Sequence, residues 1–149
     1  MKIDWKIKAF NELSTIELYT IMQLRIAIFS VEQNCVYQDA DGKDLKCFHL
    51  MGTDEEGNLI AYSRIVPPGI SFNEVSIGRV ISSQKVRGTG TGKVLMHKSI
   101  ELIEKEYGKV PIRISAQCYL IKFYSSFGFE ILGGEYIEDN IPHIEMLRQ

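Results

Sequence analysis

The chain has 149 residues, of which 45% are hydrophobic and 24% are charged, and its formal net charge at pH 7 is −2. This length and composition predict one globular domain over residues 1–149, and the near-neutral charge argues against nucleic acid or an anionic membrane surface as a partner. The sequence has no apolar run of membrane-spanning length and no signal-peptide core, so we expect a cytoplasmic protein. Its three cysteines, Cys35, Cys47 and Cys118, lack paired ligand spacing and predict neither a disulfide framework nor a zinc site.

The N-terminal part of the chain predicts a strand, a helix and a long polar loop. Apolar residues alternate with lysines over residues 5–10, as in a half-buried strand. Ser14 and Glu17 have the spacing of a capping box, which marks the start of a helix whose apolar face is interrupted by Arg25. Residues 31–45 form a polar connection that is too long for a simple turn, and long loops in compact domains are often functional.

Three aspartates lie close together in this loop, namely Asp39, Asp41 and Asp44. They do not fit the calcium-binding EF-hand pattern, because Gly42 directly follows Asp41 and no glutamate stands at the closing position. We therefore predict no metal site here. The three carboxylates suggest a cationic acceptor, or else a solvated surface.

The rest of the chain predicts strands arranged around one long helix. Residues 46–53 and 58–66 form a predicted hairpin. A β-branched strand over residues 75–81 is followed by a glycine-rich segment and a helix that ends at Tyr107–Gly108. Further on we expect a strand at 110–115, a helix at 117–127, and strands at 129–132 and 143–147. This order predicts an α+β (α/β/α) fold, in which one mixed central sheet is flanked by helices.

The segment Arg87–Gly92 has the composition of an anion-binding loop. It lies between a predicted strand and a predicted helix, where glycines let the backbone approach a ligand and the free amides of the helix favour negative charge. The P-loop pattern fails because Val94 follows Lys93, and the dinucleotide-binding pattern fails because Lys93 occupies the place of its third glycine. A phosphate-bearing ligand is the leading interpretation.

Three parts of the sequence resemble the Gcn5-related N-acetyltransferase (GNAT) family. The pattern Arg87-x-x-Gly90-x-Gly92 after a strand closely resembles the coenzyme A pyrophosphate loop of that family. Residues 123–129, Phe-Tyr-Ser-Ser-Phe-Gly-Phe, resemble its C-terminal Phe-Tyr-x-x-x-Gly-Phe segment. Residues 24–39, together with 41–45 and 141–143, are similar to the ElaA-like acetyltransferases in particular. The predicted order of elements also matches the family along nearly the whole chain.

The resemblance implies a set of site residues. A tyrosine at the place of Tyr124 lies near the coenzyme A sulfur in the family, and the end of the central strand offers backbone groups to the thioester. The residues implied for coenzyme A binding are Val80, Ile81, Ser82, Arg87, Gly88, Thr89, Gly90, Thr91, Gly92, Lys93, Gln117 and Tyr124. Those implied for the acceptor substrate are Arg25, Phe29, Glu32 and His49. Arg25 and Glu32 equally fit a paired charge set, and His49 fits a core histidine.

The sequence leaves the general base open among Glu32, His49, Glu74 and His143. We favour His143, which follows Pro142 directly before the predicted final strand, and expect Tyr124, His143 and Glu32 as the catalytic set. His97 lies on the polar side of the predicted helix and is expected to have no part in the reaction.

The expected activity is transfer of an acetyl group from acetyl-coenzyme A to a primary amine of a small molecule, protein or peptide. The amine would attack the thioester directly in a ternary complex, without an acyl-enzyme and without a metal. Orienting the two reactants can lower the barrier by about 7–11 kcal/mol. Two alternatives stay open, a non-catalytic coenzyme A-binding sensor and an acyltransferase like the acyl-homoserine-lactone synthases. We expect a monomer or a homodimer.

Overall fold

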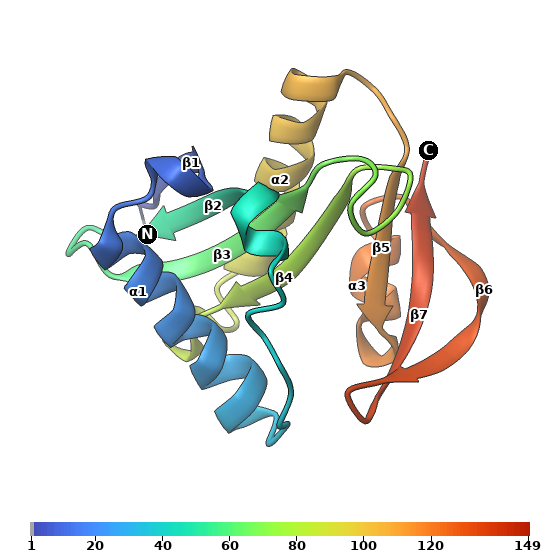
Figure 1. Cartoon of the computed structure of the whole chain (residues 1–149), viewed down its shortest axis with the longest axis horizontal. Coiled ribbons are helices and arrows are strands. Elements are labelled where there is room, and N and C mark those ends of the chain that lie inside the picture. The colour runs from blue at the N-terminus through green and yellow to red at the C-terminus, as the bar shows by residue number, and fades with distance from the viewer. Residues whose placement is uncertain (1) are drawn as a thin grey trace.

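The computed structural model describes residues 2–149, which form seven strands and three α-helices (Figure 1). The strands are β1 Asp4–Ala9, β2 Phe48–Thr53, β3 Leu59–Val66, β4 Ser76–Ser82, β5 Ile112–Gln117, β6 Phe129–Glu138 and β7 Ile141–Arg148. The α-helices are α1 Thr15–Arg25, α2 Thr91–Tyr107 and α3 Ile121–Ser125, and α1 continues as a π-helical segment over Ile26–Glu32. Within residues 2–149, no helix is long and apolar enough to span a membrane.

The strands form two antiparallel sheets instead of the one sheet that we expected. The first has the order β1-β2-β3-β4 and the second the order β5-β7-β6. A parallel bridge between Val75 and Ile112 joins them, and β4 and β5 diverge from that point, as Figure 1 shows. The register of β4 against β3 shifts between Gly78 and Ile81, which is a β-bulge, and such bulges bend a strand. The bend separates the two sheets at the C-terminal ends of β4 and β5.

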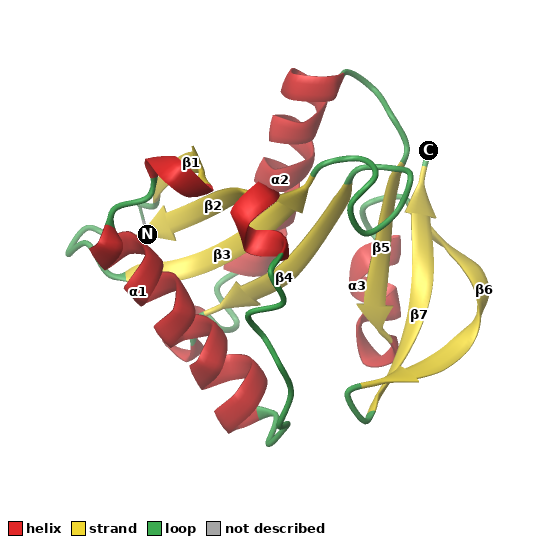
Figure 2. Ribbon diagram, in the orientation of Figure 1, coloured by secondary structure: helices red, strands yellow, loops and turns green. Residues whose placement is uncertain are grey.

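Helices cover both faces of the first sheet, which confirms the α+β (α/β/α) class (Figure 2). Successive residues of a strand point to opposite faces, so Met51 and Tyr62 pack against α1 whereas Leu50 and Ala61 pack against Leu95 of α2. Each fully buried aliphatic or aromatic side chain stabilises the fold by roughly 1.5–3 kcal/mol relative to an exposed one. The α/β/α layering follows from this alternation.

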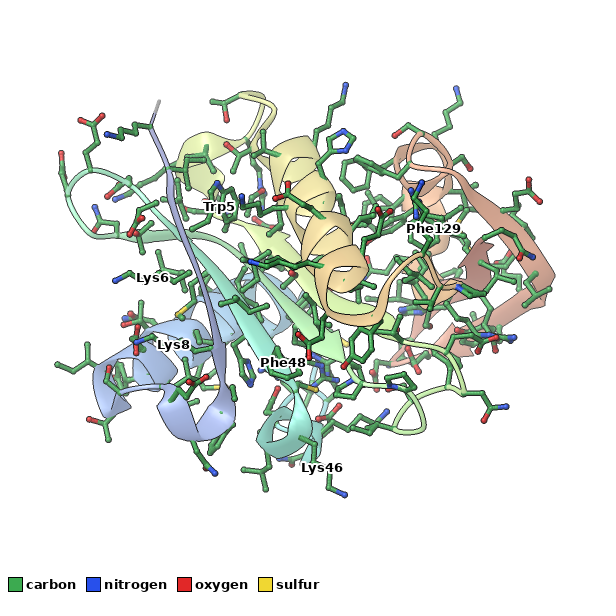
Figure 3. The ribbon with its side chains drawn as sticks, turned by 90° about the horizontal axis from the view of Figure 1, so that it is seen from above. Trp5, Lys6, Lys8, Lys46, Phe48 and Phe129 are labelled. Carbon is green, nitrogen blue, oxygen red and sulfur yellow. The ribbon has the colours of Figure 1, made fainter. Side chains whose placement is uncertain are left out.

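The alternation also explains how β1 is placed. Trp5 packs on the α2 side of the sheet, opposite Gly52 of β2, whereas Lys8 on the other side pairs with Glu17 of α1 (Figure 3). A Cβ atom at residue 52 would approach the Trp5 ring to 2.7 Å, so only glycine leaves room for the indole. The predicted strand over residues 5–10 is thus confirmed to within one residue at each end.

Several predicted boundaries were wrong where pairing between distant strands decided the structure. Gln117 does not begin a helix but ends β5, where it pairs with His143, and α3 itself starts only at Ile121. The final strand begins at Ile141, two residues before the predicted start at 143, so His143 lies inside β7. The loop expected over residues 31–45 starts as helix, because the helical segment after α1 continues through Glu32.

Candidate active site

A cavity of about 920 Å³ lies where β4 and β5 diverge, and many of the predicted site residues line it. The predicted residues on its wall are Phe29, Glu32, Val80, Ile81, Ser82, Arg87, Gln117, Tyr124 and His143. They come from the helical segment after α1, from both diverging strands, from the glycine loop, from α3 and from β7. Of the predicted site residues, Arg25, His49 and the loop residues 88–93 are not among the lining residues.

The glycine loop has the geometry of an anion site. Gly88 and Gly90 have φ values of +79° and +84°, a left-handed conformation that glycine adopts without strain, and α2 begins directly after them. The amides of Gly88, Gly90, Thr91 and Gly92 have no hydrogen-bond acceptor within residues 2–149. A Cβ atom at Gly88 or Gly90 would meet no protein atom within 4 Å, so the space above them is open to a ligand. Free amides at a helix N-terminus favour a phosphate group.

Arg87 pairs with Glu32, and both residues line the cavity. Its Nη1 and Nη2 donate to the two carboxylate oxygens of Glu32 at 2.6 and 2.8 Å, and Gln84 donates to the same carboxylate. The hydrogen bonds from Arg87 keep the pKa of Glu32 below its usual value. This pairing matches the paired charge set considered for Glu32 and argues against Glu32 as the general base.

Tyr124 projects from α3 into the cavity wall with 7% of its surface exposed. Its ring makes edge contacts with Phe123 and Phe129, which fix its orientation. The hydroxyl group has no hydrogen-bond partner within residues 2–149, and burial raises the pKa of Tyr124 above its usual value. The phenol therefore stays protonated at neutral pH and is free to donate a hydrogen bond to a ligand.

His143 is oriented by its own strand and by a stacked ring. Its Nδ1 lies 2.7 Å from the carbonyl oxygen of Ile141, and its ring stacks on Tyr136 with centroids 6.0 Å apart. A carbonyl oxygen only accepts hydrogen bonds, so we assign the proton to Nδ1 and the lone pair to Nε2. Nε2 lies 3.6 Å from the nearer carboxylate oxygen of Glu138 and makes no hydrogen bond within residues 2–149. A basic nitrogen is thus available at the cavity wall.

Arg25 lies in a buried charge network instead of the acceptor cavity. Its side chain has no exposed surface, and its Nε and Nη1 donate to Asp39 at 2.9 Å and Asp44 at 2.8 Å. Burial alone would lower the pKa of Arg25, but the hydrogen bond and charge of Asp44 raise it above its usual value. We therefore correct the predicted substrate contact of Arg25 to a structural one, because a fully buried guanidinium cannot reach a ligand.

The three loop aspartates are all neutralised by arginines. Arg64 binds Asp41 at 2.6 Å and Asp44 at 2.9 Å, and Arg79 binds Asp39 at 2.7 Å. The argument from these aspartates to a cationic acceptor therefore fails, since their charge is already matched within the protein.

The other two base candidates are also occupied. His49 is 1% exposed, with Nδ1 at 2.6 Å from the Tyr62 hydroxyl and Nε2 at 2.9 Å from the carbonyl oxygen of Asp44, and burial lowers its pKa. It is the core histidine that the sequence allowed. Glu74 accepts two hydrogen bonds from Arg113, at 3.0 and 2.9 Å, and does not line the cavity.

Sequence reasoning missed several residues of the cavity. Arg79 has a φ of +50° at the bulge of β4, and its guanidinium lies over the rings of Phe29 and Tyr37. A non-glycine residue with such a φ inside a strand is a strained position, and only the bulge explains it. The turn Asp139–Asn140 was visible in principle, because this residue pair favours the two-residue hairpin turn that it forms.

The segment Glu32–Cys35 connects the helical segment after α1 to other elements that line the cavity. The side-chain amides of Gln33 and Gln117 bond to each other at 3.3 and 3.4 Å, and the Cys35 thiol donates to the carbonyl oxygen of Asp139 at 3.0 Å. With the pair of Glu32 and Arg87, these contacts link the helical segment after α1 to the glycine loop and to the second sheet. No local sequence pattern predicts these contacts, because the partners are far apart in sequence.

Comparison with known proteins identifies the family. Residues 29–149 match the family model described as an acetyltransferase (GNAT) domain. The chain belongs to the GNAT acetyltransferase family. Protein ElaA of Escherichia coli is 43% identical to this GNAT protein over 149 residues, covering 99% of this chain and 97% of ElaA.

Solved structures agree with this assignment. A crystal structure of an acyl-CoA N-acyltransferase from Pseudomonas aeruginosa is 41% identical, with a TM-score of 0.94 over 99% of this chain and 100% of that one. The crystal structure of E. coli ElaA is 42% identical, with a TM-score of 0.91 and the same coverage. An aminoglycoside 6′-N-acetyltransferase complexed with coenzyme A has the same fold, with a TM-score of 0.69 at 15% identity over 96% of both chains. The predicted family and its ElaA-like branch are confirmed.

Proposed function

We propose that this GNAT protein transfers an acetyl group from acetyl-coenzyme A to a primary amine by direct attack within a ternary complex. One juxtaposition carries the proposal: Arg87, which directly precedes the loop with four amides that have no acceptor within residues 2–149, lines a cavity whose wall also holds Tyr124 and the free Nε2 of His143. Such a site offers an anion cradle, a hydrogen-bond donor and a base, which are the groups that aminolysis of a thioester needs.

In the proposed reaction, the acceptor ammonium loses a proton to Nε2 of His143 and its nitrogen attacks the thioester carbonyl. The new C–N bond gives a tetrahedral intermediate with a negatively charged oxygen, which backbone groups of Val80–Ser82 stabilise. The C–S bond then breaks as the nitrogen loses its second proton to water, which gives the neutral amide, and the electron pair of the C–S bond remains on sulfur as a thiolate. One oriented oxyanion donor of this kind contributes about 10²–10³ in rate.

Tyr124 is proposed to donate a hydrogen bond to the departing sulfur. A thiol has a pKa of about 8.5 and an unperturbed tyrosine of about 10, so full proton transfer from tyrosine to thiolate is already unfavourable by about 2 kcal/mol. Burial raises the pKa of Tyr124 further and makes the phenol a weaker acid. A hydrogen bond that strengthens as negative charge develops on sulfur fits this residue better than complete proton transfer.

Replacing Tyr124 with phenylalanine is expected to lower kcat by about 10–100-fold and leave KM for acetyl-coenzyme A nearly unchanged, because the lost hydrogen bond forms mainly in the transition state. Steady-state release of free thiol measures both constants. The matched control is Tyr107→Phe, which removes a hydroxyl from the far end of α2, away from the active-site cavity. Because the Tyr124 hydroxyl has no protein partner within residues 2–149, Tyr124→Phe should unfold with nearly the same free energy as the wild-type protein. A clearly lower free energy of unfolding would point to a structural role instead of a catalytic one.

Replacing Gly90 with alanine is expected to weaken acetyl-coenzyme A binding by at least about tenfold, because its methyl group would occupy the space proposed for the pyrophosphate. Isothermal titration measures the affinity. Gly108→Ala is the control, since Gly108 lies at the other end of α2 with a φ of +79° and equally open surroundings. Alanine costs about 1–2 kcal/mol of strain at either residue, so only the ligand distinguishes the two variants.

The outcomes of these titrations are distinct. Micromolar binding that is lost in Gly90→Ala and retained in Gly108→Ala supports the glycine loop as the coenzyme A site. No binding to the wild-type protein would refute the proposal. Binding without thiol release in the presence of any amine would favour the non-catalytic sensor over the enzyme.

A further inference from the structure

The turn between β6 and β7 places two carboxylates at the wall of the cavity. Asp139 and Asn140 have φ values of +51° and +63°, which form a two-residue hairpin turn, and both Glu138 and Asp139 line the cavity. Within residues 2–149, neither carboxylate forms an ion pair with a lysine or arginine. Nε2 of His143 lies 3.6 Å from Glu138.

The remaining acidic residues of the cavity carry no free charge. Glu32 is paired with Arg87, Asp41 is paired with Arg64, and Glu145 is paired with Arg113 at 3.0 Å. These pairs leave the two turn carboxylates as the local excess of negative charge.

One lysine also lines the cavity, but it lies at the other end of β5. Lys43 donates to Ser71 at 3.0 Å, in the connection that leads to Val75, and Val75 pairs with the first residue of β5. His143 instead pairs with Gln117, the last residue of that strand. The excess negative charge therefore surrounds the proposed base and not the whole cavity.

His143 is the second observation that points to a ligand at this place. The residue is only 7% exposed, and its free Nε2 faces the cavity beside Glu138 without a hydrogen-bond partner within residues 2–149. An amine that reaches Nε2 comes to lie against Glu138, whereas Asp139 is available to a second charge farther along the ligand. The apolar side chains of Ile28 and Ile141 line the same cavity and suit a methylene chain.

We propose that the acceptor of this GNAT protein is a small aliphatic polyamine, an alkyl chain whose reacting primary amine lies beside Glu138 and whose second ammonium group is bound by Asp139. This inference rests on the proposed function and specifies its acceptor. A small molecule fits better than a polypeptide, because the bonds from Gln33 to Gln117 and from Cys35 to Asp139 join cavity-lining residues of different elements to each other and restrict access between them.

The test compares 1,4-diaminobutane with n-butylamine, which has the same carbon chain and one amine fewer. At saturating acetyl-coenzyme A, we expect thiol release with a kcat/KM at least about tenfold higher for the diamine, after correction for its two reactive ends. In the double variant Glu138→Gln, Asp139→Asn this ratio should fall below about threefold, and asparagine retains the turn. Glu130→Gln, an exposed carboxylate near the opposite end of β6 and outside the cavity lining, should leave the ratio unchanged.

A binding measurement makes the test independent of turnover. Isothermal titration of 1,4-diaminobutane into the wild-type protein saturated with coenzyme A should show binding that the double variant loses and that 0.5 M salt weakens. Equal rates for the two amines in the wild-type protein, with thiol release from both, would overturn this inference and leave the proposed function intact. A diamine preference that survives in the double variant would overturn it too, because the second charge would then be bound elsewhere. Absence of transfer to every amine would refute the proposed function and this inference together.

Discussion

Replacing His143 with glutamine is expected to lower kcat/KM for the acceptor amine by about 10²–10⁴, the range that a positioned general base contributes. The reason is geometric, since Nδ1 is committed to the Ile141 carbonyl oxygen at 2.7 Å and Nε2 is left as the free acceptor at the cavity wall. Glutamine keeps a polar side chain of similar length but cannot take up the proton of the ammonium. Thiol release at saturating acetyl-coenzyme A measures the effect.

The pH dependence separates a base from a merely structural histidine. An alkylamine has a pKa of about 10.4, so at higher pH more of the acceptor arrives already deprotonated and the base is needed less. The ratio of wild-type to His143→Gln kcat/KM should therefore fall as the pH rises from 7 to 10. His97→Gln is the control, because His97 is exposed on α2, packs against the ring of Phe127 and does not line the cavity. A His143→Gln variant within twofold of wild-type activity at pH 7 would remove His143 from the mechanism.

Replacing Arg25 with methionine is expected to reduce the free energy of unfolding by about 3–5 kcal/mol, because it leaves buried carboxylates without their partner. Arg25 is fully buried and binds both Asp39 and Asp44, and its guanidinium also lies 5.9 Å from the centre of the Tyr62 ring. Urea unfolding at pH 7 measures the change. Arg25→Lys keeps the charge but cannot bind two aspartates in the same geometry. Its free energy of unfolding should lie between those of the wild-type protein and Arg25→Met.

Arg113→Met is the matched control for this prediction. Arg113 also binds two carboxylates, those of Glu74 and Glu145, but its side chain is 26% exposed, and pairs in contact with solvent contribute at most about 1 kcal/mol. If Arg25→Met reduced the free energy of unfolding no more than Arg113→Met does, the buried network would not stabilise the fold as predicted.

Acid titration gives the buried network a second readout. Burial raises the pKa of Asp44, but the hydrogen bond and charge of Arg25 outweigh burial and hold that pKa below its usual value. A carboxylate with a lowered pKa in the folded protein stabilises it above the unfolded pKa of about 3.9, and this stability is lost as the pH falls below about 4. Removing Arg25 should therefore make the unfolding free energy less dependent on pH in this acidic range.

The glycine loop and the helix ends could be predicted from the sequence because each depends on residues only a few positions apart. Ser14 accepts a hydrogen bond from the amide of Glu17 at 3.0 Å, as the capping box predicts, and Gly108 ends α2 with a φ of +79°. The alternation of side chains in β1 and β2 likewise fixed which face each residue takes. These local rules, with the family resemblance, were sufficient for the α/β/α layering and for the position of the loop beside α2.

The partners of the charged residues were decided only by the tertiary structure. The pair of Glu32 and Arg87 joins residues 55 positions apart, and it changes Glu32 from a candidate base into the partner of the loop arginine. In the sequence, Arg25 is a charged residue on an otherwise apolar helical face. Only the structure shows that its side chain is buried and bound to Asp39 and Asp44. The sequence by itself determined which segments are helix, strand and glycine loop, because short-range sterics and hydrogen bonding select them. The bulge that parts β4 from β5, the free nitrogen of His143 and the unpaired turn carboxylates beside it were decided by strand pairing and burial, since charge and proton affinity depend on neighbours that the chain brings together only when folded.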